Sequence, residues 1–239
     1  INNAEANVFN STKKLLLTSL LLLPFIASQN ASAGGVALGG TRLIYPIGNN
    51  QASMPITNSD EKGTFLIQTW VEDSKEVKTS DFVITPPLFA IDPESENTLR
   101  IAYIGSKTLP NDRETVYWLN VKAIPAAKSP IKDSNTLQIA VLNRIKLFMR
   151  PKNLPMKSVD APAQLRFHRS GSQLIIKNPT PYYVTLVQFK AGSQKIPNTM
   201  VSPMESTTLT LPDNAQGEIT FQTVSDFGAN SATQKSVME

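Results

Sequence analysis

Apolar and polar side chains alternate along most of the chain, in short runs separated by turn residues. The runs cover residues 41–46, 63–71, 82–85, 98–104, 115–123 and 137–149, followed by residues 164–169, 173–178, 182–190, 206–211 and 217–224. Because successive strand side chains point to opposite faces, such runs predict half-buried β-strands. No long stretch of the sequence shows the 3.6-residue period of an amphipathic helix. The pattern therefore predicts an all-β fold of the sandwich type.

One of these apolar runs is unusually long. It extends over residues 135–148, and alternation places Leu137, Ile139 and Val141 on one face. A long apolar strand at a sheet edge is an aggregation hazard that proteins normally avoid. Such an edge becomes useful when a second chain adds a strand to it. On these residues alone, an ordinary position inside a sandwich core is the alternative.

The first part of the sequence has the pattern of a secretory signal. Lys13 and Lys14 form a basic region, residues 15–26 are almost all apolar, and the Ala31-Ser32-Ala33 triplet fits a cleavage site. We therefore predict that residues 1–33 are a signal peptide, removed after Ala33. A membrane-spanning helix is the alternative, but spanning requires about 20 apolar residues and this run is shorter.

A proline-rich stretch divides the remaining chain. Residues 151–163 contain Pro151, Pro155 and Pro162 and show little alternation. Proline has no N–H to donate to a strand ladder, so such a stretch is typical of a connection. We predict a first domain over residues 34–154 and a second over residues 155–239, each of a size that suits an immunoglobulin-like sandwich.

Composition excludes several classes of function. The chain has no cysteine and one histidine, which argues against a zinc site and leaves few routes to acid–base or nucleophilic catalysis. The net charge of +4 is mild and its basic residues are scattered, so nucleic-acid binding is not indicated. The sequence also lacks the motifs of serine hydrolases, P-loop enzymes and zinc peptidases. We therefore expect a protein without enzyme activity, metal or cofactor.

Six segments, in this order, resemble the periplasmic pilus chaperones of chaperone–usher systems, with the type 1 fimbrial branch closest. They are GGVALGGTRLIYP (34–46), TPPLFAIDPESENTLRI (85–101), LPNDRETVYWLNVKAIP (109–125), NTLQIAVLNRIKLFMRP (135–151), NPTPYYVTL (178–186) and SDFGA (225–229). The resemblance implies two immunoglobulin-like β-sandwich domains in an L or boomerang arrangement. It also implies location in the periplasm.

The resemblance implies a mechanism for the long apolar run. Chaperones of this family lend one strand to a fimbrial subunit that lacks its last strand, and residues 135–148 match that donor strand. Leu137, Ile139 and Val141 match its alternating apolar residues. Arg42 and Lys146 match two basic residues that hold the carboxylate at the subunit's C-terminus. On bare sequence, both would be interpreted as solvated surface charges.

A third set of matched residues has a structural role in the family. Glu114, Arg150 and Asp226 correspond to a charge network between the two domains. An arginine that bridges carboxylates from two domains would restrict their relative motion. Without the resemblance, each could be an exposed charge that contributes less than about 1 kcal/mol to stability.

The implied partners are fimbrial subunits and an outer-membrane usher that receives them. Self-association of the free protein through the same edge stays an open alternative. Two other functions are weighed. A structural pilus subunit usually carries a disulfide, which this chain cannot form. A secreted carbohydrate-binding sandwich would expose aromatic side chains, whereas Trp70 and Trp118 lie in strand-like runs that suggest core positions.

Overall fold

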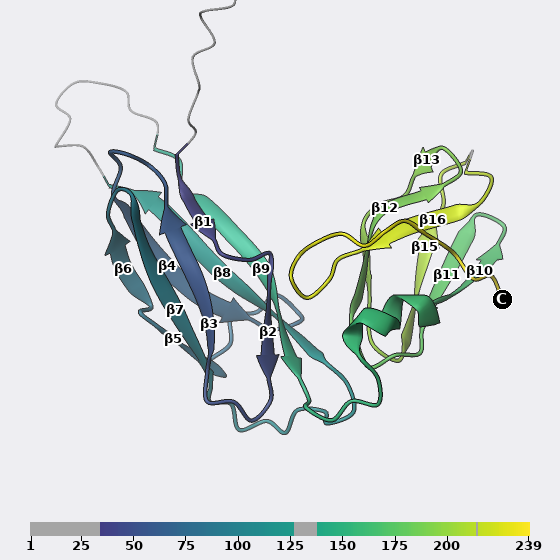
Figure 1. The fold of residues 1–239 in the computed structure, drawn as a ribbon, viewed down its shortest axis with the longest axis horizontal. Coiled ribbons are helices and arrows are strands. Elements are labelled where there is room, and N and C mark those ends of the chain that lie inside the picture. The colour runs from purple at the N-terminus through teal and green to yellow at the C-terminus, as the bar shows by residue number, and fades with distance from the viewer. Residues whose placement is uncertain (1–33, 127–137, 214) are drawn as a thin grey trace, which may run out of the picture. The chain divides into compact units, whose positions relative to one another are not determined.

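The computed structural model describes residues 34–126, 138–213 and 215–239. The predicted signal peptide, residues 1–33, lies outside the described residues, and so does Leu137. The described chain consists almost entirely of strands, with one 3-10 helix, η2, over Ser158–Gln164. In Figure 1 the purple-to-teal strands form a first sandwich and the green-to-yellow strands a second.

The first sandwich contains a four-stranded and a five-stranded sheet. The four-stranded sheet has the order β1 (Val36–Leu38), β3 (Ala52–Asn58), β7 (Ser95–Tyr103), β5 (Phe82–Thr85). The five-stranded sheet has the order β2 (Arg42–Pro46), β9 (Val141–Arg150), β8 (Thr115–Pro125), β4 (Phe65–Glu72), β6 (Leu88–Ile91). All of these neighbours are antiparallel except β2 and β9, which are parallel.

The chain changes sheets between its first two strands. β1 pairs with β3, and after three intervening residues (39–41) β2 begins at Arg42, paired with β9. The backbone N–H of Gly39 bonds to the Pro55 carbonyl at 2.8 Å, which holds the chain at the crossing point. A side chain on Gly39 would meet Pro55, since an added Cβ would lie 3.0 Å from that ring. Glycine therefore permits the close approach on which the crossing depends.

Alternate residues of both sheets pack into one core. Its fully buried members include Ile56, Leu99 and Ile101 from one sheet and Leu119 and Leu147 from the other. Burial of each such side chain contributes about 1.5–3 kcal/mol relative to exposure. Because the core takes one face of each strand, the other face of the five-stranded sheet is left to carry polar and functional side chains.

The second sandwich has its own core, between a three-stranded and a five-stranded sheet. One sheet has the order β10 (Arg166–Ser170), β11 (Gln173–Asn178), β15 (Glu205–Thr210). The other has the order β13 (Gln194–Lys195), β12 (Val184–Ala191), β16 (Ile219–Thr223), β17 (Gln234–Lys235), with β14 (Thr199–Val201) also paired to β12. Their core includes Phe167, Leu174, Leu186 and Phe221. An all-β fold of two sandwiches was the prediction, and it is confirmed.

Each predicted strand corresponds to an observed one, although the ends differ by a few residues. The sequence patterns missed β1, β3, β6, β13, β14 and β17, and the helix η2 inside the predicted connection. β3 was missed because Pro55 interrupts it. The strand tolerates this proline because Pro55 needs only its carbonyl at the edge facing Gly39.

The prediction of a strand beginning at Asn135 is wrong for residues 138–140. Residues 138–140 have no strand structure, and β9 begins at Val141. The reason lies in the neighbouring strand. β8 and β9 pair from Thr115↔Met149 to Ala123↔Val141, so the same register would place Ile139 opposite Pro125, which has no N–H to donate. The ladder therefore stops, and the Gln138 side chain instead donates a hydrogen bond to the Pro125 carbonyl.

Within the described ranges, no helix is both long and apolar enough to cross a membrane.

Candidate functional site: a cationic hollow beside an open strand edge

Two basic side chains lie directly opposite each other on the parallel strands of the first sandwich. Arg42 is the first residue of β2 and pairs with Lys146 of β9. Their chain neighbours Leu43 and Leu147 point into the core, so the two cations face the opposite side of the sheet. They line an open hollow of about 300 Å³, together with Trp118 and with Thr185 and Val224 of the second sandwich. The sequence prediction thus placed both residues at one site.

Arg42 is only partly satisfied by the protein. Its Nη1 donates to the Val224 carbonyl at 3.0 Å, and its guanidinium carbon lies 5.8 Å from the Phe148 ring centroid. Its Nε is buried and has no hydrogen-bond partner among the described residues. Burial lowers the pKa of Arg42 while Asp226 opposes that shift, and the group stays a cation at neutral pH. A buried donor without a partner costs free energy, so the site is prepared for an acceptor.

Lys146 is held by a neutral group. Its Nζ donates a hydrogen bond to Thr185 Oγ1 at 3.2 Å and lies 5.9 Å from the Trp118 ring centroid. Within the described residues it forms no ion pair. Burial, and then the charge of Arg42, lower the pKa of Lys146 to about 8. Asp226 and Glu114 act on Arg42 from a distance, whereas no carboxylate acts on the pKa of Lys146. Two neighbouring cations, one of them without a counter-charge, make this hollow a site for an anion.

A third cation nearby is already neutralised. Arg144 stacks over Trp118, with 4.2 Å between the guanidinium carbon and the ring centroid. It pairs with Glu72 at 3.2 Å and with Glu76 at 3.1 Å. The free positive charge of the hollow is therefore that of Arg42 and Lys146. The prediction of core positions for Trp70 and Trp118 is wrong, because both lie on the outer face of the sheet, half-buried and outside the core.

The edge of β9 above these cations has no strand neighbour among the described residues. β2 pairs with β9 from Lys146 to Arg150 only, which leaves that edge uncovered from Val141 to Ile145. The apolar side chains next to it are exposed to 64% for Ile139 and 52% for Val141. Exposed apolar side chains beside unpaired backbone are the features that strand addition requires.

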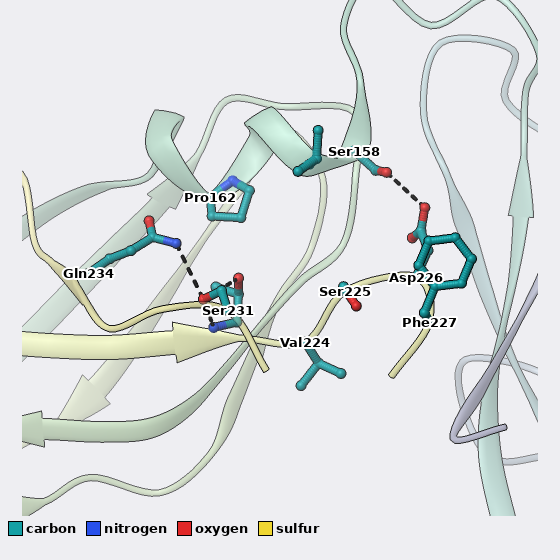
Figure 2. A pocket seen from close by; sticks show the side chains of 10 residues that line it. Ser158, Pro162, Val224, Ser225, Asp226, Phe227, Ser231 and Gln234 are labelled. Carbon is teal, nitrogen blue, oxygen red and sulfur yellow. Dashed lines mark hydrogen bonds between the residues drawn. The ribbon is translucent and has the colours of Figure 1, made fainter. Parts of the chain in front are cut away.

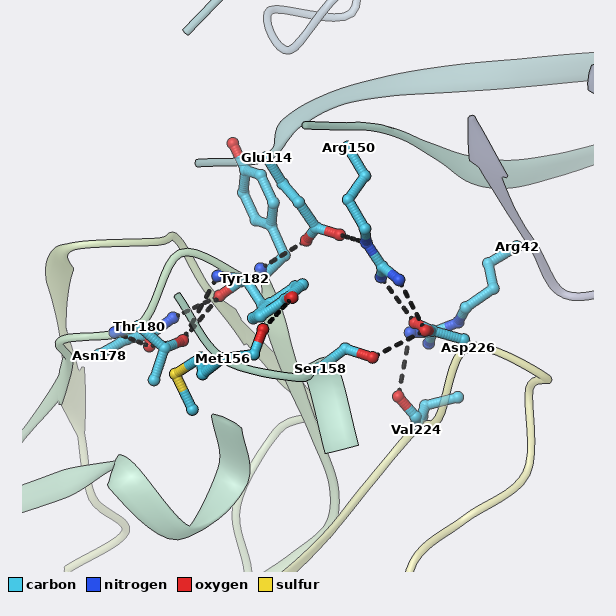
Figure 3. A network of polar contacts seen from close by, with 11 residues as sticks. Arg42, Glu114, Arg150, Met156, Ser158, Asn178, Thr180, Tyr182, Val224 and Asp226 are labelled. Carbon is cyan, nitrogen blue, oxygen red and sulfur yellow. Dashed lines mark hydrogen bonds and ion pairs between the residues drawn. The ribbon is translucent and has the colours of Figure 1, made fainter. Parts of the chain in front are cut away.

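A second cluster of charges joins the two sandwiches and is shown in Figure 3. Arg150 of β9 donates from Nε to Glu114 Oε1 at 2.6 Å. Its two terminal nitrogens donate to the two oxygens of Asp226, both at 2.7 Å. The three residues predicted as a charge network thus form one in the structure. Glu114 is only 3% exposed, and burial raises its pKa against the pull of Arg150.

Three partners of this cluster were not found from the sequence. Glu114 Oε2 accepts from the backbone N–H of Tyr183 at 2.8 Å, and Ser158 Oγ donates to Asp226 at 2.8 Å. The Tyr182 ring lies 5.0 Å from the Arg150 guanidinium carbon. Hydrogen bonds from Arg150 and then from Ser158 hold the pKa of Asp226 below its usual value. The NPTPYYVTL motif contains Tyr182 and Tyr183, but nothing in its sequence indicates that they contact Arg150 and Glu114.

A further hollow, of about 260 Å³, lies in the second sandwich beside the loop that follows β16 and contains Asp226 (Figure 2). η2 and the loop after β16 line it, with Val159, Pro162 and Val224 among the apolar residues. Phe227 stands at its rim and is 95% exposed. Its neighbours are fixed, since Asp226 is bound by Arg150 and Gly228 approaches Thr41 closely.

Two family models together match most of the described chain. Residues 35–155 match the model of the pili and flagellar-assembly chaperone N-terminal domain, and residues 160–235 match that of the pili assembly chaperone C-terminal domain. The chaperone protein FimC of Escherichia coli K12 is 43% identical over 242 residues, covering 100% of both chains. The probable fimbrial chaperone SfmC of the same strain is 45% identical, covering 91% of this chain and 95% of its own.

Solved structures agree with these matches. The periplasmic chaperone SfaE is 42% identical, with a TM-score of 0.74, and the match covers 86% of this chain and all (100%) of that one. A structure of the Salmonella enterica SafA pilin in complex with the SafB chaperone matches with a TM-score of 0.77 and 30% identity, covering 85% of this chain and 96% of that one. These matches do not favour a structural pilus subunit or a carbohydrate-binding protein.

Proposed function

Because the chain belongs to the family of pili-assembly chaperones, we propose that it acts in the periplasm on fimbrial subunits. It binds a subunit that lacks one strand, protects the open groove of that subunit, and delivers it to an outer-membrane usher. The observation that carries the proposal is the uncovered edge of β9, which ends at Arg42 and Lys146. No reaction is catalysed and no cofactor is consumed in this scheme.

The first step is capture of the subunit's terminal carboxylate by the two cations. The planar guanidinium of Arg42 matches the two oxygens of a carboxylate, and Lys146 adds a point charge. Binding supplies the missing acceptor for the buried Nε of Arg42 and the missing counter-charge for Lys146. A hydrogen bond to a charged group contributes about 1.5–3 kcal/mol.

The position of the cations sets the direction of the incoming strand. Arg42 is the first residue of β2, and β2 runs parallel to β9. A chain that ends at Arg42 and lies on the open edge of β9 must continue the line of β2 in the same direction. The added strand is therefore parallel to β9, and its last residues lie opposite Ile145 and the residues before it.

The apolar residues then supply what the subunit lacks. Val141 lies on the same face of β9 as Ile145, Leu147 and Met149, which pack against or within the first core. Ile139 joins this row once residues 138–140 become extended beside the subunit. They extend that row beyond the sandwich, where a partner can bury them. Leu137 would continue the row by one more position. A slip of one residue would turn the row to the wrong side, so the fixed carboxylate also fixes the register.

The remaining assignments complete the proposal. Residues 1–33 direct export and are then removed, and the chain divides into domains over residues 34–154 and 155–239. Glu114, Arg150 and Asp226 tie the two domains together through buried or half-buried ion pairs. Because Val224 and Thr185 belong to the second sandwich and reach Arg42 and Lys146, this tie also keeps the anion site assembled.

The test is recovery of subunits with the tagged protein from the periplasm of a fimbriated host. Mass spectrometry should identify fimbrial subunits with the unmodified protein and none with Lys146→Ala or Arg42→Ala. Lys152→Ala is the matched control, since Lys152 is an exposed lysine just beyond β9. Equal subunit recovery with all four proteins would contradict the proposed anchor.

A further inference from the structure

A buried threonine of the second sandwich faces the anion site. Thr185 lies in β12, where its neighbours Val184 and Leu186 belong to the second core. Alternation therefore directs the Thr185 side chain away from that core, and it lines the hollow that contains Arg42 and Lys146. Its side chain is nevertheless buried, with the residue only 7% exposed. A hydroxyl buried at such a place costs free energy unless it is hydrogen-bonded.

The backbone of Thr185 does not explain the hydroxyl. Thr185 pairs with Met200 of β14, and its carbonyl accepts from the Val224 N–H at 3.2 Å. Valine would serve equally well in such a strand, because both residues are β-branched. The only side-chain hydrogen bond of Thr185 among the described residues is the one accepted from Lys146.

We propose that Thr185 is the third ligand of the anion bound by Arg42 and Lys146, so that its hydroxyl accepts from the ammonium and donates to a carboxylate oxygen. This inference rests on the proposed function. A hydroxyl has one donor and two acceptor positions. The ammonium occupies an acceptor position and repels the hydroxyl hydrogen, which turns toward the hollow. The site then offers donors from three residues that line it: the guanidinium of Arg42, the ammonium of Lys146 and the hydroxyl of Thr185.

The arrangement also prepares Lys146 for binding. A lysine side chain loses rotamer freedom when it is fixed, and the Thr185 contact fixes it before the ligand arrives. Since the acceptor position of Thr185 facing the cations is occupied, a ligand oxygen suits this place better than a ligand N–H. The site should therefore distinguish a free C-terminal carboxylate from a C-terminal amide.

The test compares two synthetic peptides with the same sequence of alternating isoleucine and threonine, with N-terminal lysines for solubility. One ends in a free carboxylate and the other in an amide. The unmodified protein should bind the free acid more tightly. Thr185→Val should lower affinity for the acid at least about tenfold and leave affinity for the amide unchanged. Thr185→Ser retains the hydroxyl and should keep most of the affinity for the acid.

The possible outcomes separate the inference from the proposed function. Equal loss for both peptides with Thr185→Val would assign Thr185 a structural role and overturn the inference. Unchanged or tighter binding of the acid by Thr185→Val would also overturn it, because Thr185 would then only hold the Lys146 ammonium in the free protein. If the unmodified protein does not distinguish the two peptides, the carboxylate anchor itself fails. Thermal melting of each variant shows whether it is folded.

Discussion

Arg150 and Asp226 form a two-pronged ion pair across the two sandwiches, with both nitrogen–oxygen distances at 2.7 Å. The remaining nitrogen of the guanidinium binds Glu114, so one side chain serves two carboxylates from distant parts of the chain. Paired oxygens on a planar fork leave little freedom of rotation. The contact therefore fixes an orientation in addition to neutralising charge.

Removal of Arg150 should destabilise the protein strongly. Arg150→Met would leave Glu114 buried without its cation, and breaking a buried pair from one side costs about 3–5 kcal/mol. Chemical denaturation measures the loss. Glu114→Gln in the same background should restore part of the stability, because it removes the stranded charge. A loss below about 1 kcal/mol, as for a surface pair, would contradict the structural role of the network.

Binding of subunits should weaken as the pH rises through about 8, where the lowered pKa of Lys146 lies. The stability of the free protein should change in the opposite direction. Between about 8 and the ordinary lysine value of 10.5, the unfolded chain holds the extra proton, so the free energy of unfolding rises with pH.

Titration of subunit affinity and of unfolding midpoints over this range checks both trends. Lys146→Arg keeps a charge throughout the range and serves as the control, which should show neither trend. A pH dependence that persists in Lys146→Arg would place the titrating group elsewhere.

The exposed apolar row should matter for binding and not for folding. Ile139→Asp should reduce subunit capture at least tenfold. The loss of one buried aliphatic side chain alone accounts for about that factor, and the new charge would also have to enter the subunit's apolar groove. The melting temperature should stay within about 2 °C, because Ile139 is 64% exposed. Leu147→Asp, on the same face but in the core, should prevent folding. A large fall in melting temperature for Ile139→Asp would show that the free protein buries this residue.

The loop after β16 offers a test of how tightly the second sandwich meets Thr41. Gly228 has a φ of +83°, and an added Cβ would clash with Thr41 Oγ1. Gly228→Ala should therefore cost more than about 1 kcal/mol of stability and weaken subunit binding. Gly171→Ala is the control, since its φ is +58° but no atom lies near the added Cβ. Equal costs for the two would mean that only the backbone conformation matters.

Local sequence patterns predicted most of the strands, whereas the remaining features depend on contacts between residues far apart in the sequence. Alternation located most strands, because one face of each is buried. It failed at Pro55, where only the neighbouring strand shows that no N–H is needed, and at residues 138–140, because the limit of β9 is set by Pro125 in β8. The charged residues were placed by resemblance. No sequence pattern indicates that Thr185 meets Lys146, since 39 positions separate them and the contact depends on how two sandwiches meet.

The crossing of the chain at Gly39 has one more consequence. Continuing the β2–β9 register backwards would place Val36–Leu38 opposite residues 140–142 and residues 39–41 opposite the rest of the bare stretch. The open edge of β9 is thus the position that residues 36–41 would occupy if they continued β2 in the same sheet instead of joining the four-stranded sheet. A variant in which residues 36–41 paired with β9 would cover its own open edge. Such a protein would fold well but could not accept a strand from a partner.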